Sequence, residues 1–334
     1  MSDLQPLVPA ETELEDGGHN LTYFAFTAGA KPVVPVEQGP RGELPAILAG
    51  RYRLERILGS GGMGVVYRAR DLLHEQFGDP DPYLAIKVLK DDIAESPDAS
   101  VLLYSEFALT RHLCHPHVVR LHTFEVDSQC HRAFITMELM RGLTLDQMLF
   151  EQPEGLPWEE FHALALGMLH TLAHAHDQGV LHGDLKPGNL MLTENGLRLF
   201  DFGLGQAMEG VMPGLAQISR ERFNAWTPNY AAPELLEGEP LSKAADVYAM
   251  ACILYELASG RHPFNRLTAL QAREQKLERK LRRPRRLPKQ CWLGLRRALA
   301  LDPKRRQITA RQLQEAFWVG NPSFMARWFS QRNG

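Results

Sequence analysis

Short stretches in which apolar and polar residues alternate fill the chain between residues 51 and 140, and they predict β-strands. These stretches cover residues 51–58, 65–69, 83–89, 118–126 and 133–139. Residues 100–114 instead have the spacing of a helix, while residues 70–82, with a glycine and two prolines, predict a long loop. This part of the chain is expected to be mainly strand with one helix.

Beyond residue 145 the apolar residues recur at helical intervals. Helices are predicted at residues 158–178, 243–259, 267–281, 289–299 and 310–317. A small strand-rich lobe followed by a larger helical lobe predicts an α+β fold.

The first 50 residues differ from the rest. They contain six prolines, seven acidic and two basic side chains, which predicts a poorly ordered acidic arm. A flexible tail is the simpler interpretation of this arm, and a role in docking a partner stays open. The folded domain is expected at 51–317, with lobes at about 51–140 and 141–317 and a short tail at 318–334.

Composition excludes several classes of protein. The 334 residues are 44% hydrophobic with a net charge of −3, so the whole molecule has no electrostatic attraction to nucleic acid or to an anionic membrane. Cys114, Cys130, Cys252 and Cys291 include no C-x-x-C pair, which argues against disulfides and structural zinc. The start lacks a signal-peptide pattern, and the most apolar helix, 244–258, is too short and polar to span a bilayer. We expect a cytoplasmic protein without a membrane anchor.

A glycine-rich sequence lies between the first two predicted strands. It runs Gly59-Ser60-Gly61-Gly62-Met63-Gly64, and glycines let a backbone turn tightly and approach phosphate oxygens. Dinucleotide-binding folds use the same spacing, but their loop leads into a helix. Because residues 65–69 predict a strand here, a hairpin over phosphates is favoured.

A lysine in a later strand could reach the same phosphates. Lys87 would need a carboxylate to hold it, and Glu106 in the predicted helix 100–114 is the best placed. Taken singly, both residues are more often ordinary surface charges.

Three further motifs follow in order: His182-Gly183-Asp184-Leu185-Lys186-Pro187-Gly188-Asn189, Asp201-Phe202-Gly203 and Ala232-Pro233-Glu234. With the glycine-rich sequence and Lys87, they resemble the protein kinase superfamily from about residue 51 to 317. The residues of the glycine-rich sequence are most similar to those of the eukaryotic-like (Hanks-type) serine/threonine kinases of bacteria. The resemblance implies the two-lobed protein kinase fold. It also implies ATP-dependent phosphorylation of serine and threonine on proteins, with autophosphorylation, in intracellular signalling.

The resemblance also assigns roles to residues. Asp184 would accept the proton of the substrate hydroxyl, Lys186 would lie near the γ-phosphate, and Lys87 would orient the α- and β-phosphates. Asn189 and Asp201 would hold Mg²⁺, with Mn²⁺ as an alternative. The nucleotide would lie among Leu58, Gly59, Ser60, Gly61, Gly62, Met63, Gly64, Val66, Ala85, Lys87, Glu106, Met137, Glu138, Leu139 and Met191. Met137 matches the gatekeeper position, and residues 138–140 match the hinge whose backbone would bind the adenine edge.

Several contacts are expected to be structural. By the same resemblance, Glu234 should pair with Arg306, and Asp246 should anchor the catalytic loop. Thr227 should touch the catalytic aspartate and lysine.

Alternatives and partners stay open beside the kinase interpretation. Gly183 stands where many kinases have arginine, which suggests a pseudokinase that binds nucleotide as a scaffold. A kinase that acts on a small molecule is disfavoured by the Ala232-Pro233-Glu234 segment. Against the pseudokinase, the five expected polar residues are all present: Lys87, Glu106, Asp184, Asn189 and Asp201. The expected partners are protein substrates and a counteracting phosphatase, and no nucleic acid.

Two further features, a basic stretch and a histidine pair, indicate function less specifically. Residues 273–311 carry fifteen basic and three acidic side chains, which predicts either solvated helix faces or a surface that attracts acidic substrates or the acidic arm. His170 and His174 have the spacing of metal ligands on a helix, but no third ligand suggests itself and no metal site is expected there.

Overall fold

The computed structural model describes residues 44–61, 64–90, 94, 98–215 and 227–318. The predictions for the arm at 1–43, for Gly62 and Met63 and for the tail at 319–334 lie outside these residues.

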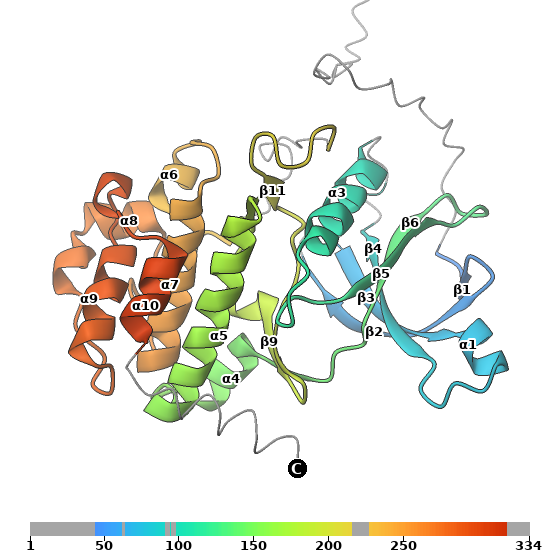
Figure 1. Cartoon of the computed structure of the whole chain (residues 1–334), viewed down its shortest axis with the longest axis horizontal. Helices are drawn as coiled ribbons and strands as arrows, with labels where there is room; N and C mark the ends of the chain where they lie inside the picture. Colours follow the sequence, from blue (N-terminus) through green and yellow to red (C-terminus); the bar gives the residue numbers. More distant parts are fainter. Residues whose placement is uncertain (1–43, 62–63, 91–93, 95–97, 216–226, 319–334) are drawn as a thin grey trace, which may run out of the picture. The chain divides into compact units, whose positions relative to one another are not determined.

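The first part of the described chain is an antiparallel six-stranded sheet in the order β1-β2-β3-β4-β6-β5. Helix α3 (Ala99–His112) packs against β5 and β6 (Figure 1). The strands are β1 (Ile47–Leu48), β2 (Tyr52–Ser60), β3 (Gly64–Asp71), β4 (Tyr83–Leu89), β5 (Leu121–Val126) and β6 (Ala133–Met137). The predicted strand-rich lobe with one main helix is therefore present.

Two local features differ from the prediction. Strand β1 pairs with β2, so the folded chain includes residues 44–50, which had been assigned to the arm. Helix α1 (Leu72–Gln76) occupies part of the predicted loop. It forms because the Asp71 side chain accepts hydrogen bonds from the backbone N–H groups of Leu73 and His74 and so caps the helix.

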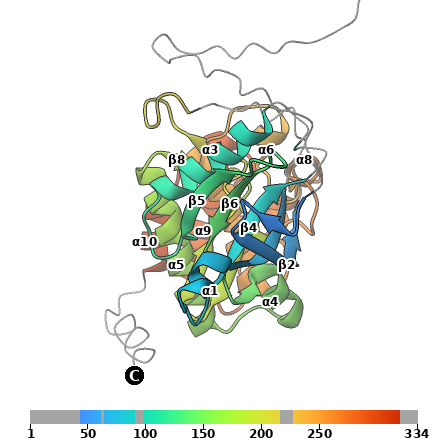
Figure 2. The ribbon, with the colours of Figure 1, turned by 90° about the vertical axis from the view of Figure 1, so that its right-hand side faces the viewer.

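The second part is mainly helical, and Figure 2 shows its helices behind the sheet. Three strands form a small sheet in the order β10-β9-β7, and a two-stranded pair joins β8 to β11. The helices are α4 (Leu145–Glu151), α5 (Trp158–Asp177), α6 (Pro233–Leu236), α7 (Lys243–Ser259), α8 (Ala269–Glu274), α9 (Lys289–Ala298) and α10 (Ala310–Phe317). The small strands are β7 (Gly142–Thr144), β8 (Val180–Leu181), β9 (Leu190–Thr193), β10 (Gly196–Leu199) and β11 (Gln206–Ala207).

The core of this helical part is built around α5 and α7. Helix α7 is buried on nearly all sides, and it ends at Gly260, whose φ of +71° favours glycine. The large apolar cluster joins these helices to Leu109 of α3 and to Phe202. Within the described ranges, no helix is both long and apolar enough to cross a membrane.

Candidate active site

A buried lysine links the sheet, α3 and the segment after β10. Lys87 of β4 is 7% exposed, and its Nζ lies 2.7 Å from both carboxylate oxygens of Glu106 on α3. The same Nζ lies 2.7 Å from Oδ1 of Asp201. The predicted contact between Lys87 and Glu106 is therefore present, and it extends to the predicted metal ligand.

These three charges shift one another's pKa values. Burial alone would lower the pKa of Lys87, but Asp201 and Glu106 outweigh it and raise that pKa. Burial would likewise raise the pKa of Asp201, but the Lys87 ammonium and its hydrogen bond lower it to about 2. For Glu106 burial prevails, and its pKa is raised. At neutral pH the lysine is protonated and Asp201 is ionised, as phosphate and cation binding require.

The backbone conformation at Asp201 lets two consecutive side chains point in different directions, one to the core and one to Lys87. Its φ of +65° lies in the left-handed region, which side chains other than glycine seldom adopt. The next residue, Phe202, is fully buried, and its ring centroid lies 4.5 Å from that of His182. The turn thus places Phe202 in the core while the Asp201 carboxylate faces Lys87.

The glycine-rich hairpin between β2 and β3 lies against the same lysine. The backbone N–H of Gly61 donates to the carbonyl oxygen of Gly64 at 2.9 Å, which closes the turn. A Cβ at Gly64 would lie 2.8 Å from the Val88 carbonyl oxygen and 3.2 Å from Cε of Lys87. Only glycine fits this position, so the predicted phosphate loop lies directly beside the predicted phosphate-binding lysine.

The residues predicted to surround adenine are partly brought together. Ala85 on β4 is the cross-strand partner of Met137 on β6, and one apolar cluster contains Val66, Ala85, Met137 and Leu139. Met191 is on β9, where it pairs with Thr144 of β7.

The remaining predicted nucleotide contacts lie at the edges of this region. Leu58, Gly59 and Ser60 are exposed at the end of β2. The Glu138 backbone N–H donates to the Arg120 carbonyl oxygen at 3.0 Å. Hydrogen bonds to an adenine edge must therefore come from the other backbone groups of 138–140.

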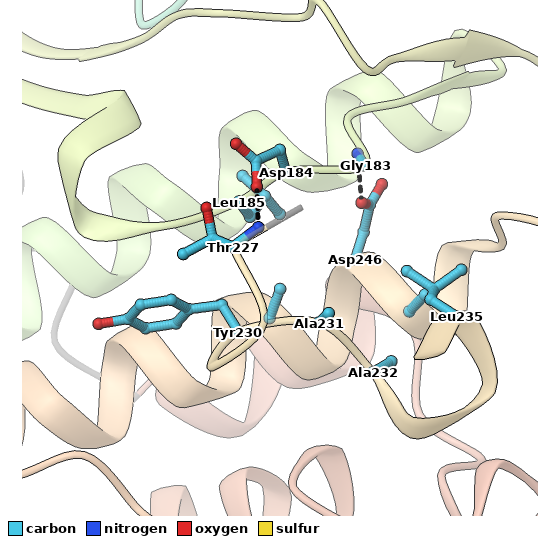
Figure 3. A pocket seen from close by; sticks show the side chains of 11 residues that line it. Gly183, Asp184, Leu185, Thr227, Tyr230, Ala231, Ala232, Leu235 and Asp246 are labelled. Carbon is cyan, nitrogen blue, oxygen red and sulfur yellow. Dashed lines mark hydrogen bonds between the residues drawn. The ribbon is translucent and has the colours of Figure 1, made fainter. Parts of the chain in front are cut away.

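A second polar group surrounds Asp184, in the loop after β8. Lys186 Nζ lies 2.6 Å from Asp184 Oδ2 and 3.1 Å from Thr227 Oγ1. The Thr227 backbone N–H donates to Asp184 Oδ1 at 3.3 Å (Figure 3). Asn189 Nδ2 donates to the Asp184 carbonyl oxygen at 2.9 Å. The predicted Thr227 contacts are confirmed, and they hold the aspartate in one orientation.

The loop that carries Asp184 is anchored from α7. The buried Asp246 carboxylate accepts from the backbone N–H of His182 and of Gly183, each at 2.9 Å, and lies 3.0 Å from His176 Nε2. Gly183 has a φ of +81°, a conformation that favours glycine. Figure 3 shows the bond from Gly183 to Asp246. The expected anchoring role of Asp246 is confirmed.

The segment after Thr227 is held in place by a buried ion pair. Arg306 Nη1 lies 2.5 Å from Glu234 Oε1, as predicted. Between this segment, the loop that carries Asp184 and α7 lies a cavity of about 10 Å³ (Figure 3), about the space that one water molecule needs.

Sequence reasoning missed a second set of contacts in this segment. Tyr230 donates its hydroxyl to Glu256 Oε2 at 2.5 Å, and Arg266 Nη2 lies 2.7 Å from Glu256 Oε1. His262 Nε2 lies 3.0 Å from the Asn229 carbonyl oxygen. The available signal was a glutamate inside the most apolar helix of the chain, which requires buried partners.

The His170 and His174 pair and the basic stretch lie outside this site. His115 joins the His170 and His174 pair, with His115 Nε2 lying 3.1 Å from His170 Nδ1. Across the described residues, however, no three histidine, cysteine, aspartate or glutamate side chains are arranged to hold a metal ion. Most basic side chains of 273–311 are exposed on α8, α9 and their connections.

Comparison with known proteins gives a consistent match. The protein kinase domain family matches residues 52–319. The serine/threonine-protein kinase PkaA of Streptomyces coelicolor is 34% identical over 265 residues, which are 77% of this chain and 47% of PkaA. PknA of Mycobacterium tuberculosis is 32% identical over 65% of this chain and 48% of its own length. RqkA of Deinococcus radiodurans, a DNA damage-responsive serine/threonine-protein kinase, is 36% identical over 65% of this chain and 31% of its own length. The chain thus spans half or less of the length of these relatives.

Proposed function

Because the chain belongs to the protein kinase family, we propose that it transfers the γ-phosphoryl group of ATP to serine or threonine hydroxyls of proteins. The observation that carries this proposal is the Lys87 ammonium, which is bonded at once to Glu106 on α3 and to Asp201 after β10. A scaffold that only bound nucleotide would not need Asp184, Lys186 and Thr227 held together as well.

The donor groups present fit ATP with a divalent cation. The Asn189 amide nitrogen is used by the Asp184 carbonyl, which leaves its Oδ1 as an acceptor for a cation. Asp201 is ionised, and oxygen donors of this kind suit Mg²⁺ and also Mn²⁺. When bound, the cation would neutralise charge on the phosphates.

Different residues of this chain would have different roles in phosphoryl transfer. Lys87 would hold the α- and β-phosphates, and Asp184 would orient the substrate hydroxyl and receive its proton. The hydroxyl oxygen would bond to the γ-phosphorus as the bond to the bridging oxygen of ADP breaks. Lys186, 2.6 Å from Asp184, would stabilise negative charge on the transferred group.

The same proposal includes the setting of the reaction. We place it in the cytoplasm, where ATP is available and where the four free cysteines would stay reduced. Autophosphorylation, a role in signalling and a phosphatase that removes the phosphate belong to the proposal, by likeness to the bacterial serine/threonine kinases.

Transfer of label from γ-labelled ATP to a cell extract and to the chain itself tests this function. Lys87→Ala and Asp184→Ala should each abolish transfer while circular dichroism shows an unchanged fold, and chelation of divalent metal should do the same. Phosphoamino-acid analysis should give phosphoserine and phosphothreonine. Transfer by either variant within about tenfold of wild type, a difference of only about 1.4 kcal/mol in the barrier, would contradict the assigned roles. Nucleotide binding without any transfer would establish the scaffold instead.

A further inference from the structure

A groove lies on the helical part, between α4, the start of α5 and the small β-sheet. Its volume is about 440 Å³, and it is lined by residues of 141–143, of α4 and the loop after it, of β9 and the adjoining Glu194, and by Glu160 of α5. Leu143 in its wall is 44% exposed, and Phe150 on α4 is 89% exposed. Exposed apolar side chains around a groove commonly mark a surface that binds another segment.

The charge of the groove selects the kind of segment. Glu151, Glu160 and Glu194 all line it, are exposed, and form no ion pair with another described residue. Arg141, also in the lining, is already paired with Asp81 at 3.1 Å. A segment that combines basic and large apolar side chains would therefore complement this groove.

The last residues of the sequence have this composition. Residues 319–334 contain Arg327 and Arg332, no acidic residue, and four large apolar side chains: Phe324, Met325, Trp328 and Phe329. With this composition we propose that residues 319–334 dock in the groove of the same molecule, with the two arginines at the glutamates.

This docking is feasible because the end of α10 lies against the start of α5. The carbonyl oxygen of Phe317 lies 2.8 Å from His162 Nε2, and the Phe317 ring packs 6.0 Å from that of Phe161. His162 is two residues from Glu160 on α5, about 3 Å along the helix axis and about 200° around it, so the segment would have to pass around the start of α5. Residues 319–323 can span up to about 17 Å when extended. Docking requires this length to run from the end of α10 past the start of α5 to the groove.

Cleavage of the full-length chain by chymotrypsin after Trp328 and Phe329, followed by mass spectrometry, tests the docking without any need for kinase activity. Cleavage tracks the fraction of the segment that is undocked. The triple variant Glu151→Lys/Glu160→Lys/Glu194→Lys should be cleaved at least about tenfold faster than wild type, since tenfold is the loss of roughly one good contact. The matched control Glu209→Lys/Glu239→Lys/Glu274→Lys, at three exposed glutamates outside the groove, should leave the rate unchanged.

A charge swap separates docking from a general effect of the substitutions. Combining the triple variant with Arg327→Glu/Arg332→Glu should restore slow cleavage, because opposite charges again face each other. Equal rates for wild type and the triple variant, or no restoration by the swap, would overturn the proposal. Protection that grows with protein concentration would also overturn it, by showing that the groove holds the segment of a second copy.

Discussion

His262 joins the loop after α7 to the segment that carries Thr227. Its Nδ1 accepts from the backbone N–H groups of Phe264 and Arg266, at 3.2 and 3.1 Å, so Nε2 must donate to the Asn229 carbonyl oxygen. Only the neutral imidazole can make all three bonds. Burial lowers the pKa of His262 to about 4, which agrees with this geometry.

We therefore expect His262 to make stability depend on pH. Below its ordinary pKa of about 6.5 the unfolded chain takes up a proton at this histidine, while the folded chain resists protonation down to about pH 4. The unfolded state then binds more protons, so stability falls as the pH falls. Between pH 7 and 5 this contribution is roughly 2 kcal/mol. Urea denaturation at several pH values measures it.

The variant His262→Gln isolates this effect. It should lower stability at pH 7 through the lost hydrogen bonds, but it should also flatten the decrease between pH 7 and 5. His112→Gln, at an exposed histidine at the end of α3, is the matched control and should keep the wild-type slope. Parallel curves for wild type and His262→Gln would show that His262 is not the titrating group.

At the scale of elements, the sequence predicted those whose ends carry local signals. Helix α7 was predicted with its observed bounds, because Ser242 caps its start through the N–H of Ala245 and Gly260 ends it. The predicted helix 267–281 is shorter, since it breaks at Lys276, which has a φ of +53°. Strand β1 was missed because its two residues are defined only by pairing with β2.

The same distinction between features with local sequence signals and features set by long-range packing applies to the site. The pair of Lys87 with Glu106 was predicted because Glu106 lies in the helix expected after the strand of Lys87, and the pair of Glu234 with Arg306 was predicted from the resemblance to protein kinases. The bond from Tyr230 to Glu256 was not, because it depends on how a helix is rotated in the core rather than on neighbouring residues. Long-range packing of this kind leaves no local pattern in the sequence.

The hairpin of β2 and β3 allows a test of its contact with Lys87. In Gly64→Ala the added methyl would meet the Val88 carbonyl and the lysine side chain. We expect this variant to lose about 1–3 kcal/mol of stability through overpacking and to bind ATP more weakly because Lys87 is displaced. Gly59→Ala is the control for stability only, because a Cβ there has nothing within 4 Å but Gly59 is itself a predicted nucleotide contact. Urea denaturation and nucleotide titration measure both, and equal stability of the two variants would contradict the close contact.

At the scale of the whole molecule, charge is distributed unevenly. The net charge is −3, yet residues 273–311 alone carry a net charge of +12. Some of these bases are neutralised, as Arg306 is by Glu234 and Arg273 by Glu237. Arg285, Arg286, Arg296 and Arg297 are exposed and form no ion pair with any residue that the structure describes. These arginines create a positive field at the surface.

Such a field should favour acidic protein substrates by raising their local concentration. The variant Arg285→Glu/Arg286→Glu should raise the KM for dephosphorylated casein, an acidic protein, several-fold at low salt with little change in kcat. The difference from wild type should shrink as salt approaches about 1 M, where the Debye length is only about 3 Å. The KM for myelin basic protein should stay the same or fall. The control Arg53→Glu/Arg111→Glu makes the same change in net charge at exposed arginines of β2 and α3. If both double variants raise the casein KM equally, the effect belongs to total charge, and the basic side chains of 273–311 are solvated helix faces.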